Sequence, residues 1–193
     1  IIAACGGYGS ARMLGKIDYR LISDHKKPFV GLSDTTALQL ALLEKSGLVS
    51  FSGYLMKPRH GREMFPYTEQ SLFDCLEGRG QVFSGLESDY NGAEISGRLI
   101  GGCLSLVAGL AGSPYFPDMS GGILVLEDLN EEPYVIDRLL TQLENAGVFD
   151  KTAAVVFGAF IDCKAKDPAD GTIADVLNLS LIHISEPTRQ AEI

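Results

Sequence analysis

The segment PFVGLSDTTALQLALLEKSG, residues 28–47, decides the fold class, because it joins a buried strand to a buried helix through one sharp corner. Residues 28–31 read as the end of a buried strand. The helix expected over residues 34–45 has apolar residues at the i, i+1, i+4, i+5 spacing of a buried helix face. These are Ala37, Leu38, Ala41 and Leu42. Strand, corner and helix in this order are typical of an α/β fold.

The corner itself carries Gly31, Ser33 and Asp34. Glycine lets the backbone turn sharply, and serine and aspartate are favoured residue types at a helix start. A serine there has its hydroxyl at the mouth of an α/β sheet, near unpaired backbone amides that can stabilise an oxyanion. Ser33 is therefore either a nucleophile or a plain helix cap, and the corner alone leaves both interpretations open.

Strands and helices alternate on both sides of this corner. The sequence predicts a first strand, a glycine-rich turn and a helix before it, and a further strand after it, which is the βαβ pattern of a parallel sheet. A second set of strands and helices follows the same pattern. The expected strands are residues 1–4, 29–31, 48–52, 123–126 and 152–160, with one more before residue 104, and the expected helices include residues 12–22, 68–76 and 133–146.

We expect two domains. Residues 1–86 are the later part of a parallel-sheet, Rossmann-like or flavodoxin-like N-terminal domain, and residues 87–92, rich in turn-forming residues, are a linker. Residues 93–178 are the first part of a second α/β domain. Residues 179–193 begin with LSLIHISEPTR, which is the translation of a sequencing-adapter DNA, so this tail is expected to be non-native and His183 to have no function.

Composition excludes several classes of function. Hydrophobic residues make up 46% and charged residues 21%, as in ordinary globular proteins, and the formal net charge is −9. No cluster of Lys and Arg is present, so nucleic acid is not an expected partner. No apolar run approaches the ~20 residues that span a bilayer, so no membrane association is expected.

Cysteines and histidines are scattered along the chain. The cysteines form no Cys-x-x-Cys pair, which indicates reduced thiols and a cytoplasmic protein rather than a disulfide framework. The histidines have no metal-ligand spacing, so no metal is expected. These residues are Cys5, Cys75, Cys103, Cys163, His25, His60 and His183.

Two further segments could carry chemistry. The turn at residues 6–10, GGYGS, could cradle a phosphate or an oxyanion, or be a plain strand-to-helix turn. Glu127 and Asp128 follow a buried strand. A carboxylate at such a strand end can orient a histidine, coordinate a metal or cap a loop, and the alternative is a solvated pair leading into an acidic loop.

Four segments together resemble a known family. They are GGYGSARML, GLSDTTALQLALLEKSGLVSFSG, GRLIGGCLSLVAGLAGSPY and GGILVLEDLNEEPYVIDRLLTQLENAGVF, in this order across residues 1–162. The resemblance is to the serine LD-carboxypeptidase family, which includes muramoyltetrapeptide carboxypeptidase and the microcin C immunity peptidases.

The resemblance implies roles for four residues. Ser33 corresponds to the nucleophile, Glu127 to the glutamate that orients the catalytic histidine, and the backbone N–H groups of Gly7 and Asp34 to the oxyanion hole. It implies hydrolysis of the L,D-peptide bond to the terminal D-alanine of a murein tetrapeptide in cell-wall recycling. It implies no metal or organic cofactor, a cell-wall peptide as partner, and a chain able to form a homodimer.

The chain departs from the family pattern at three points. Cys5 stands where the family usually has arginine, and Cys103 where it often has asparagine. The histidine motif of the Gly-x-x-x-Gly-His kind, expected after the residue 152–160 strand, is not in this sequence. The chain is therefore expected to be an incomplete and inactive part of the enzyme.

Two alternatives remain open from the sequence. The same catalytic residues could cleave a peptidyl-nucleotide antibiotic of the microcin C type. The chain could instead be a non-catalytic α/β module, in which the GGYGS turn binds an anion and Ser33 only caps a helix.

Overall fold

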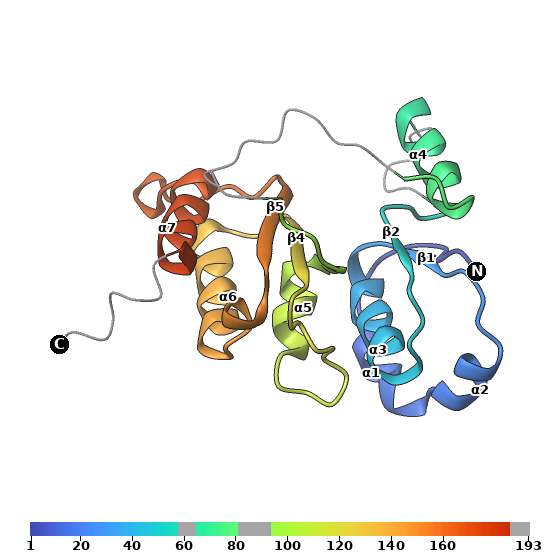
Figure 1. The fold of residues 1–193 in the computed structure, drawn as a ribbon. Helices are drawn as coiled ribbons and strands as arrows, with labels where there is room; N and C mark the ends of the chain where they lie inside the picture. Colours follow the sequence, from blue (N-terminus) through green and yellow to red (C-terminus); the bar gives the residue numbers. More distant parts are fainter. Residues whose placement is uncertain (58–64, 81–93, 186–193) are drawn as a thin grey trace. The chain divides into compact units, whose positions relative to one another are not determined.

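The computed structural model describes residues 1–57, 65–80 and 94–185 (Figure 1). The chain divides into two compact units, residues Ile1–Ile95 and Ser96–Ile193. Each unit contains a parallel sheet with helices, so the α/β fold expected from the sequence is confirmed.

The first unit is built around short parallel strands. Strand β1 (Val30–Gly31) pairs in parallel with β2 (Phe51–Ser52), and Ile2 forms a parallel bridge to Val30 on the other side. The helical elements are α1 (Ser10–Met13), η1 (Leu14–Lys16), α2 (Tyr19–Asp24), η2 (Ser33–Thr35), α3 (Thr36–Ser46) and α4 (Pro66–Leu76). The strand–turn–helix order predicted around residues 28–47 is therefore present.

Helix α3 supplies much of the core of this unit. Ala37 and Ala41 are fully buried, and Leu42 packs with Phe29 and Leu48 in an apolar cluster. The helix ends where Gly47 adopts a left-handed conformation with φ of 59°, and its N–H bonds back to the Leu43 carbonyl.

The single helix predicted over residues 12–22 is wrong. The chain forms α1, η1 and α2 instead, with an extended residue, Ile17, between the second and third. Asp18 explains the break, because its side chain accepts a hydrogen bond from the Leu21 N–H at 2.9 Å and so begins a new helix.

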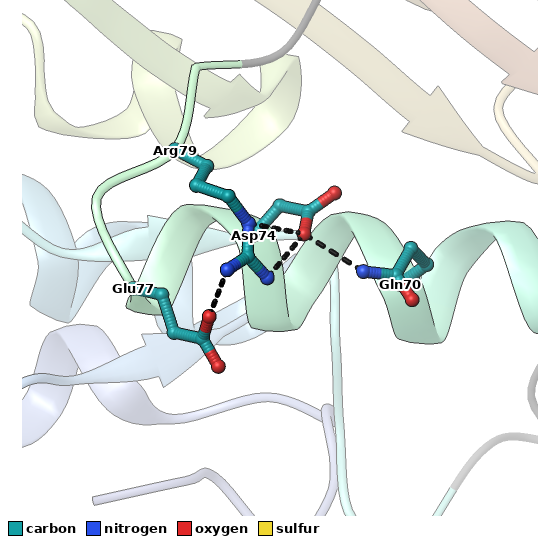
Figure 2. A network of polar contacts seen from close by, with 4 residues as sticks. All are labelled: Gln70, Asp74, Glu77 and Arg79. Carbon is teal, nitrogen blue, oxygen red and sulfur yellow. Dashed lines mark hydrogen bonds and ion pairs between the residues drawn. The ribbon is translucent and has the colours of Figure 1, made fainter.

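Helix α4 carries a polar network at its C-terminal end (Figure 2). Asp74 accepts hydrogen bonds from the amide of Gln70 and from the guanidinium of Arg79, each at 2.8 Å. Arg79 also pairs with Glu77. The chain after the helix thus folds back on the last turn of α4. This exposed network stabilises the helix end and is not a candidate catalytic or binding site.

The second unit contains a three-stranded parallel sheet in the order β3-β4-β5. Leu124 and Leu126 of the central strand are fully buried. Helices α5 and α6 lie together, and the Gln142 amide donates to the Ala108 carbonyl at 2.7 Å, while α7 lies beside α6 (Figure 1). The elements are β3 (Leu99–Cys103), α5 (Leu104–Leu110), β4 (Ile123–Leu129), α6 (Pro133–Asn145), η4 (Phe149–Lys151), β5 (Ala154–Ile161), η5 (Pro168–Asp170) and α7 (Ile173–Ser185).

Strand β4 is longer than predicted. The apolar run predicts an end at Leu126, but pairing with β5 continues through Asp128 and Leu129 after a register shift. Glu127 and Asp128 therefore lie within the strand and point to opposite faces of the sheet, as alternate residues of a strand do.

Two predictions fall partly or wholly on residues that are not described. The predicted linker, residues 87–92, lies outside the described residues. In the predicted non-native tail the backbone of residues 179–185 continues α7, and Ser180 is buried, whereas the side chains from residue 181 onward, His183 included, lie outside the description. None of the helices in the described ranges combines the length and apolar character that a membrane crossing requires.

Candidate active site

Ser33 stands at a strained corner of the first unit. The preceding residue, Leu32, is extended, and Ser33 has a φ of 62°, in the left-handed region that residues with a side chain rarely occupy. This conformation costs about 1–2 kcal/mol, so surrounding structure must hold it. A serine held this way between a strand and a helix has the geometry of a nucleophile elbow.

Gly31 makes the tight corner feasible. A Cβ atom at this position would collide with the hydroxyl oxygen of Thr35 and lie 3.2 Å from the Phe29 ring. The Thr35 hydroxyl in turn donates to the Leu32 carbonyl at 3.1 Å. Only a residue without a side chain allows the strand to turn this closely into η2.

The glycine-rich turn lies beside Ser33. A Cβ atom at Gly6 would lie 3.3 Å from Ser33 Cβ and 3.5 Å from its Oγ. Gly7 and Gly9 have φ values of 140° and 110°, which favour glycine, and space is open around the Cβ position of Gly7. The structure therefore brings the predicted oxyanion turn to the predicted nucleophile, while the donor role of the Gly7 N–H stays a prediction.

Asp34 joins the corner to the glycine-rich turn through Ser10. The Ser10 N–H donates to Asp34 Oδ2 at 3.1 Å, and the Ser10 hydroxyl donates to the Asp34 carbonyl. Ser10 is buried, with 7% of its surface exposed. No role is predicted for Ser10 from the sequence, although it stands within the GGYGS motif, and the donor role of the Asp34 N–H stays a prediction.

Glu127 is a half-buried carboxylate on β4 in the second unit. It pairs in register with Cys103 of β3, and it packs close to Gly158, where a Cβ atom would lie 3.4 Å from Glu127 Cβ. Its Oε1 atom is buried and has no hydrogen-bond partner among the described residues. Burial, followed by the negative charge of Asp128, raises the pKa of Glu127.

Asp128, by contrast, is satisfied and structural. It is 3% exposed, and its carboxylate accepts the N–H groups of Ser105 and Leu129 at 2.9 and 2.8 Å and faces the thiol of Cys103 at 3.6 Å. The interpretation of Glu127 and Asp128 as a solvated pair is therefore wrong. Burial raises the pKa of Cys103 to about 12, which keeps this cysteine a neutral thiol rather than a nucleophile.

The candidate residues divide between the two units, with Ser33, Asp34 and Gly7 in the first and Glu127 in the second. That all four face one cleft stays a prediction. His25 is exposed in the first unit, and the side chains of His60 and His183 lie outside the description. Among the described residues, no group of three or more His, Cys, Asp or Glu side chains could hold a metal ion.

Comparison with known proteins identifies the class. Residues 1–53 match the model of the LD-carboxypeptidase N-terminal domain, and residues 96–188 match that of the LD-carboxypeptidase C-terminal domain. The chain belongs to the LD-carboxypeptidase family, as the resemblance implied.

Individual relatives agree with this assignment. A probable murein peptide carboxypeptidase of Bacillus subtilis is 34% identical over 175 residues, which are 84% of this chain and 52% of the relative. The crystal structure of muramoyltetrapeptide carboxypeptidase from Oxalobacter formigenes is 34% identical with a TM-score of 0.80, covering 92% of this chain and 62% of that one. The microcin C7 self-immunity protein MccF, in complex with aspartyl sulfamoyl adenosine, is 27% identical with a TM-score of 0.77, covering 94% of this chain and 63% of that one. The chain thus spans about half the length of the curated relatives it matches.

Proposed function

We propose that this chain carries the nucleophile, the oxyanion hole and the histidine-orienting glutamate of a serine-type LD-carboxypeptidase. The observation that carries the proposal is the left-handed conformation of Ser33 at a strand-to-helix corner, directly beside the glycine-rich turn. A helix cap needs no such strain, because capping residues normally have extended backbones. Strain retained at one serine beside a glycine-rich turn favours a catalytic role.

In the proposed mechanism, Ser33 Oγ attacks the carbonyl carbon of the scissile peptide bond while a histidine takes its proton. The negative charge that develops on the carbonyl oxygen receives hydrogen bonds from the N–H groups of Gly7 and Asp34. The histidine then protonates the leaving amine, and water hydrolyses the acyl-serine ester by the same steps in reverse order.

Glu127 orients that histidine in this proposal. A buried carboxylate oxygen without a partner is costly, and an imidazole N–H is a donor that would satisfy it. When the histidine takes a proton, the negative charge of Glu127 would stabilise the imidazolium. The raised pKa of Glu127 fits a carboxyl group whose charged partner is not in place.

We infer that the substrate is the L,D-peptide bond between a diamino acid and the terminal D-alanine of a murein tetrapeptide. The names of the Bacillus subtilis relative and of the Oxalobacter formigenes structure support this substrate class. The nucleophile would lie in a domain spanning residues 1–86 and Glu127 in one that begins at residue 93. A cytoplasmic site of action fits the cysteine pattern.

We further propose that the 193-residue chain is inactive on its own. The family resemblance assigns the base to a Gly-x-x-x-Gly-His motif that this sequence does not contain. A serine without a base is a weak nucleophile at neutral pH. We expect His183 not to serve in its place, because it lies in the adapter-like tail.

A second candidate is cleavage of a peptidyl-nucleotide antibiotic on the same catalytic residues. The likeness to MccF in complex with aspartyl sulfamoyl adenosine favours this candidate. The two candidates share the nucleophile and differ in both parts of the scissile bond. The acyl group is a diamino acid in the tetrapeptide and aspartyl in the sulfamoyl adenosine, and the leaving groups are D-alanine and the sulfamoyl nucleoside, so substrate preference separates the candidates.

The experiment uses a chimera, in which this chain is completed by the segments of the Bacillus subtilis relative that lie outside the matched region. Release of D-alanine from a murein tetrapeptide is compared with cleavage of aspartyl sulfamoyl adenosine, and faster tetrapeptide cleavage supports the first candidate. Ser33→Ala should abolish turnover, by a factor on the order of 10⁶ in kcat. Ser46→Ala is the matched control, because Ser46 is a buried serine of the same unit whose hydroxyl donates to the Leu42 carbonyl. More than about a tenth of the activity retained in Ser33→Ala would overturn the nucleophile assignment.

A further inference from the structure

An aspartate directly follows each of the two proposed catalytic side chains, and both aspartates make the same kind of contact. Asp34 follows Ser33, and Asp128 follows Glu127. Each carboxylate accepts a backbone N–H from the first turn of a helix, which follows the parallel bridge at Ile2 in the first unit and the parallel strand β3 in the second. The arrangement occurs once in each unit, with partners 24 and 23 residues away in sequence.

In the first unit, the bond joins η2, which follows β1, to α1, which follows the parallel bridge at Ile2. The N-cap of α1 is Gly9, which has no side chain, so the cap comes from Asp34, whose Oδ2 accepts the Ser10 N–H at 3.1 Å. The Ser10 hydroxyl returns a hydrogen bond to the Asp34 carbonyl. Together the two bonds fix the glycine-rich turn against the Ser33 corner from both sides.

In the second unit, the bond joins β4 to the helix that follows β3. The N-cap of α5 is Cys103, and the N–H of Ser105 in the first turn donates a hydrogen bond to Asp128 Oδ2 at 2.9 Å. Asp128 Oδ1 accepts the Leu129 N–H at 2.8 Å, which fixes the end of β4 just beyond Glu127. Both oxygens of this 3% exposed carboxylate are thus used by donors of two different segments.

A carboxylate that only caps a helix has a local partner. Asp18 is such a case, since it accepts the Leu21 N–H three residues further on, at 2.9 Å. Asp34 and Asp128 instead bind a helix start that is distant in sequence, so each bond also fixes the backbone of the residue that precedes the aspartate. Catalysis depends on positions held to well under 1 Å, so this backbone restraint has a functional consequence.

We propose that Asp34 and Asp128 are positioning residues: the first holds Ser33 against the glycine-rich turn, and the second holds Glu127 in its place on β4. The inference rests on the roles proposed for Ser33 and Glu127 in catalysis. It assigns to the two aspartate side chains a task that the oxyanion role of the Asp34 backbone does not include.

The test measures backbone amide order parameters by NMR relaxation in the 193-residue chain, so it does not depend on turnover. We expect Asp34→Ala to lower the order parameters of Gly7 and Ser33 from about 0.85 to below about 0.6, the range of a flexible segment. We expect Asp128→Ala to do the same at Glu127. Asp18→Ala is the matched control, which loses a helix cap and stability but should leave these three amides unchanged.

Asparagine variants sharpen the test. Asp34 uses only Oδ2, so Asp34→Asn keeps an acceptor and should retain the order of Ser33. Asp128 uses both oxygens, so Asp128→Asn must turn an amide NH₂ towards an N–H donor and should loosen Glu127 as alanine does. If Asp34→Ala does not fold, Ser10→Ala removes the hydroxyl half of the same contact and should loosen Gly7.

Unchanged order at Ser33 and Glu127 in the alanine variants, or equal loosening in Asp18→Ala, would overturn the inference. The proposed function fails by a different result, namely activity that survives Ser33→Ala. Loosened amides together with such surviving activity would therefore contradict the nucleophile assignment and leave the positional restraint established.

Discussion

Replacing Glu127 by glutamine should stabilise the protein at neutral pH while removing a group needed for turnover. Glu127 Oε1 is buried without a partner among the described residues, and burial followed by the charge of Asp128 raises its pKa. A buried acceptor left unsatisfied costs about 1–3 kcal/mol, and more when it is charged. Glutamine has the same shape and no charge, but its amide would also lack a partner. We therefore expect the free energy of unfolding to rise by about 1 kcal/mol, the lower end of this range.

The pH dependence has a defined sign. A carboxyl group whose pKa is raised in the folded state favours folding when protonated, so its contribution is fully present below the ordinary pKa of about 4.3 and is lost as the pH rises through the raised value. Glu127→Gln should therefore match the original chain near pH 4 and become more stable than it towards pH 7. For a chain of this size, 1 kcal/mol corresponds to a rise in Tm of about 2–4 °C.

Thermal unfolding followed by circular dichroism between pH 4 and pH 8 measures this difference. Glu144→Gln is the control, because Glu144 is an exposed glutamate on α6 of the same unit. A Tm difference for Glu127→Gln that stays constant across this range, or that has the opposite sign at pH 7, would refute the interpretation of Glu127 as a desolvated carboxylate.

Three further predictions concern backbone geometry and turnover. Ser33→Gly should raise the free energy of unfolding, measured with denaturant, by about 0.5–1 kcal/mol. The relief of about 1–2 kcal/mol of left-handed strain exceeds the cost of the added chain entropy of glycine. Ser33→Ala keeps the strain and should not raise the stability. Gly101→Ala should prevent folding of the second unit, which would appear as the loss of cooperative unfolding. Gly101 has a φ of 145°, and an added Cβ would overlap the Val125 backbone. Gly109→Ala is the control and should be tolerated, because space is open around its Cβ position. In the chimera, Glu127→Gln should lower kcat less than Ser33→Ala does, since an orienting group assists the attack without making it, and an equal loss in both variants would contradict that role.

The regular elements were predictable where local signals agreed. The stripe of apolar residues in α6, bounded by Pro133 and Gly147, gave both ends of the helix within two residues. Strand β5 and the corner at Ser33 likewise lie within two residues of their predicted positions, because apolar runs and turn residues occur there together. The apolar run does not predict the burial of β5, whose residues are half-buried or exposed.

Contacts between distant segments were not predictable from the sequence. The break between α1 and α2 depends on Asp18 acting as a cap, which competes with a continuous apolar pattern. The extension of β4 past Leu126 depends on its pairing with β5. The buried state of Asp128 depends on an N–H donor 23 residues away, and no periodicity in the sequence encodes it.

The central claim is that Ser33 is an activated nucleophile, and a fluorophosphonate probe tests it most directly. The probe reacts with a serine only when a base and an oxyanion hole activate it. In the chimera, peptide mass spectrometry should locate the label on Ser33, and Ser33→Ala should remove it while Ser46→Ala does not. A chimera that releases D-alanine but carries no label on Ser33, or carries it on another serine, would contradict the account.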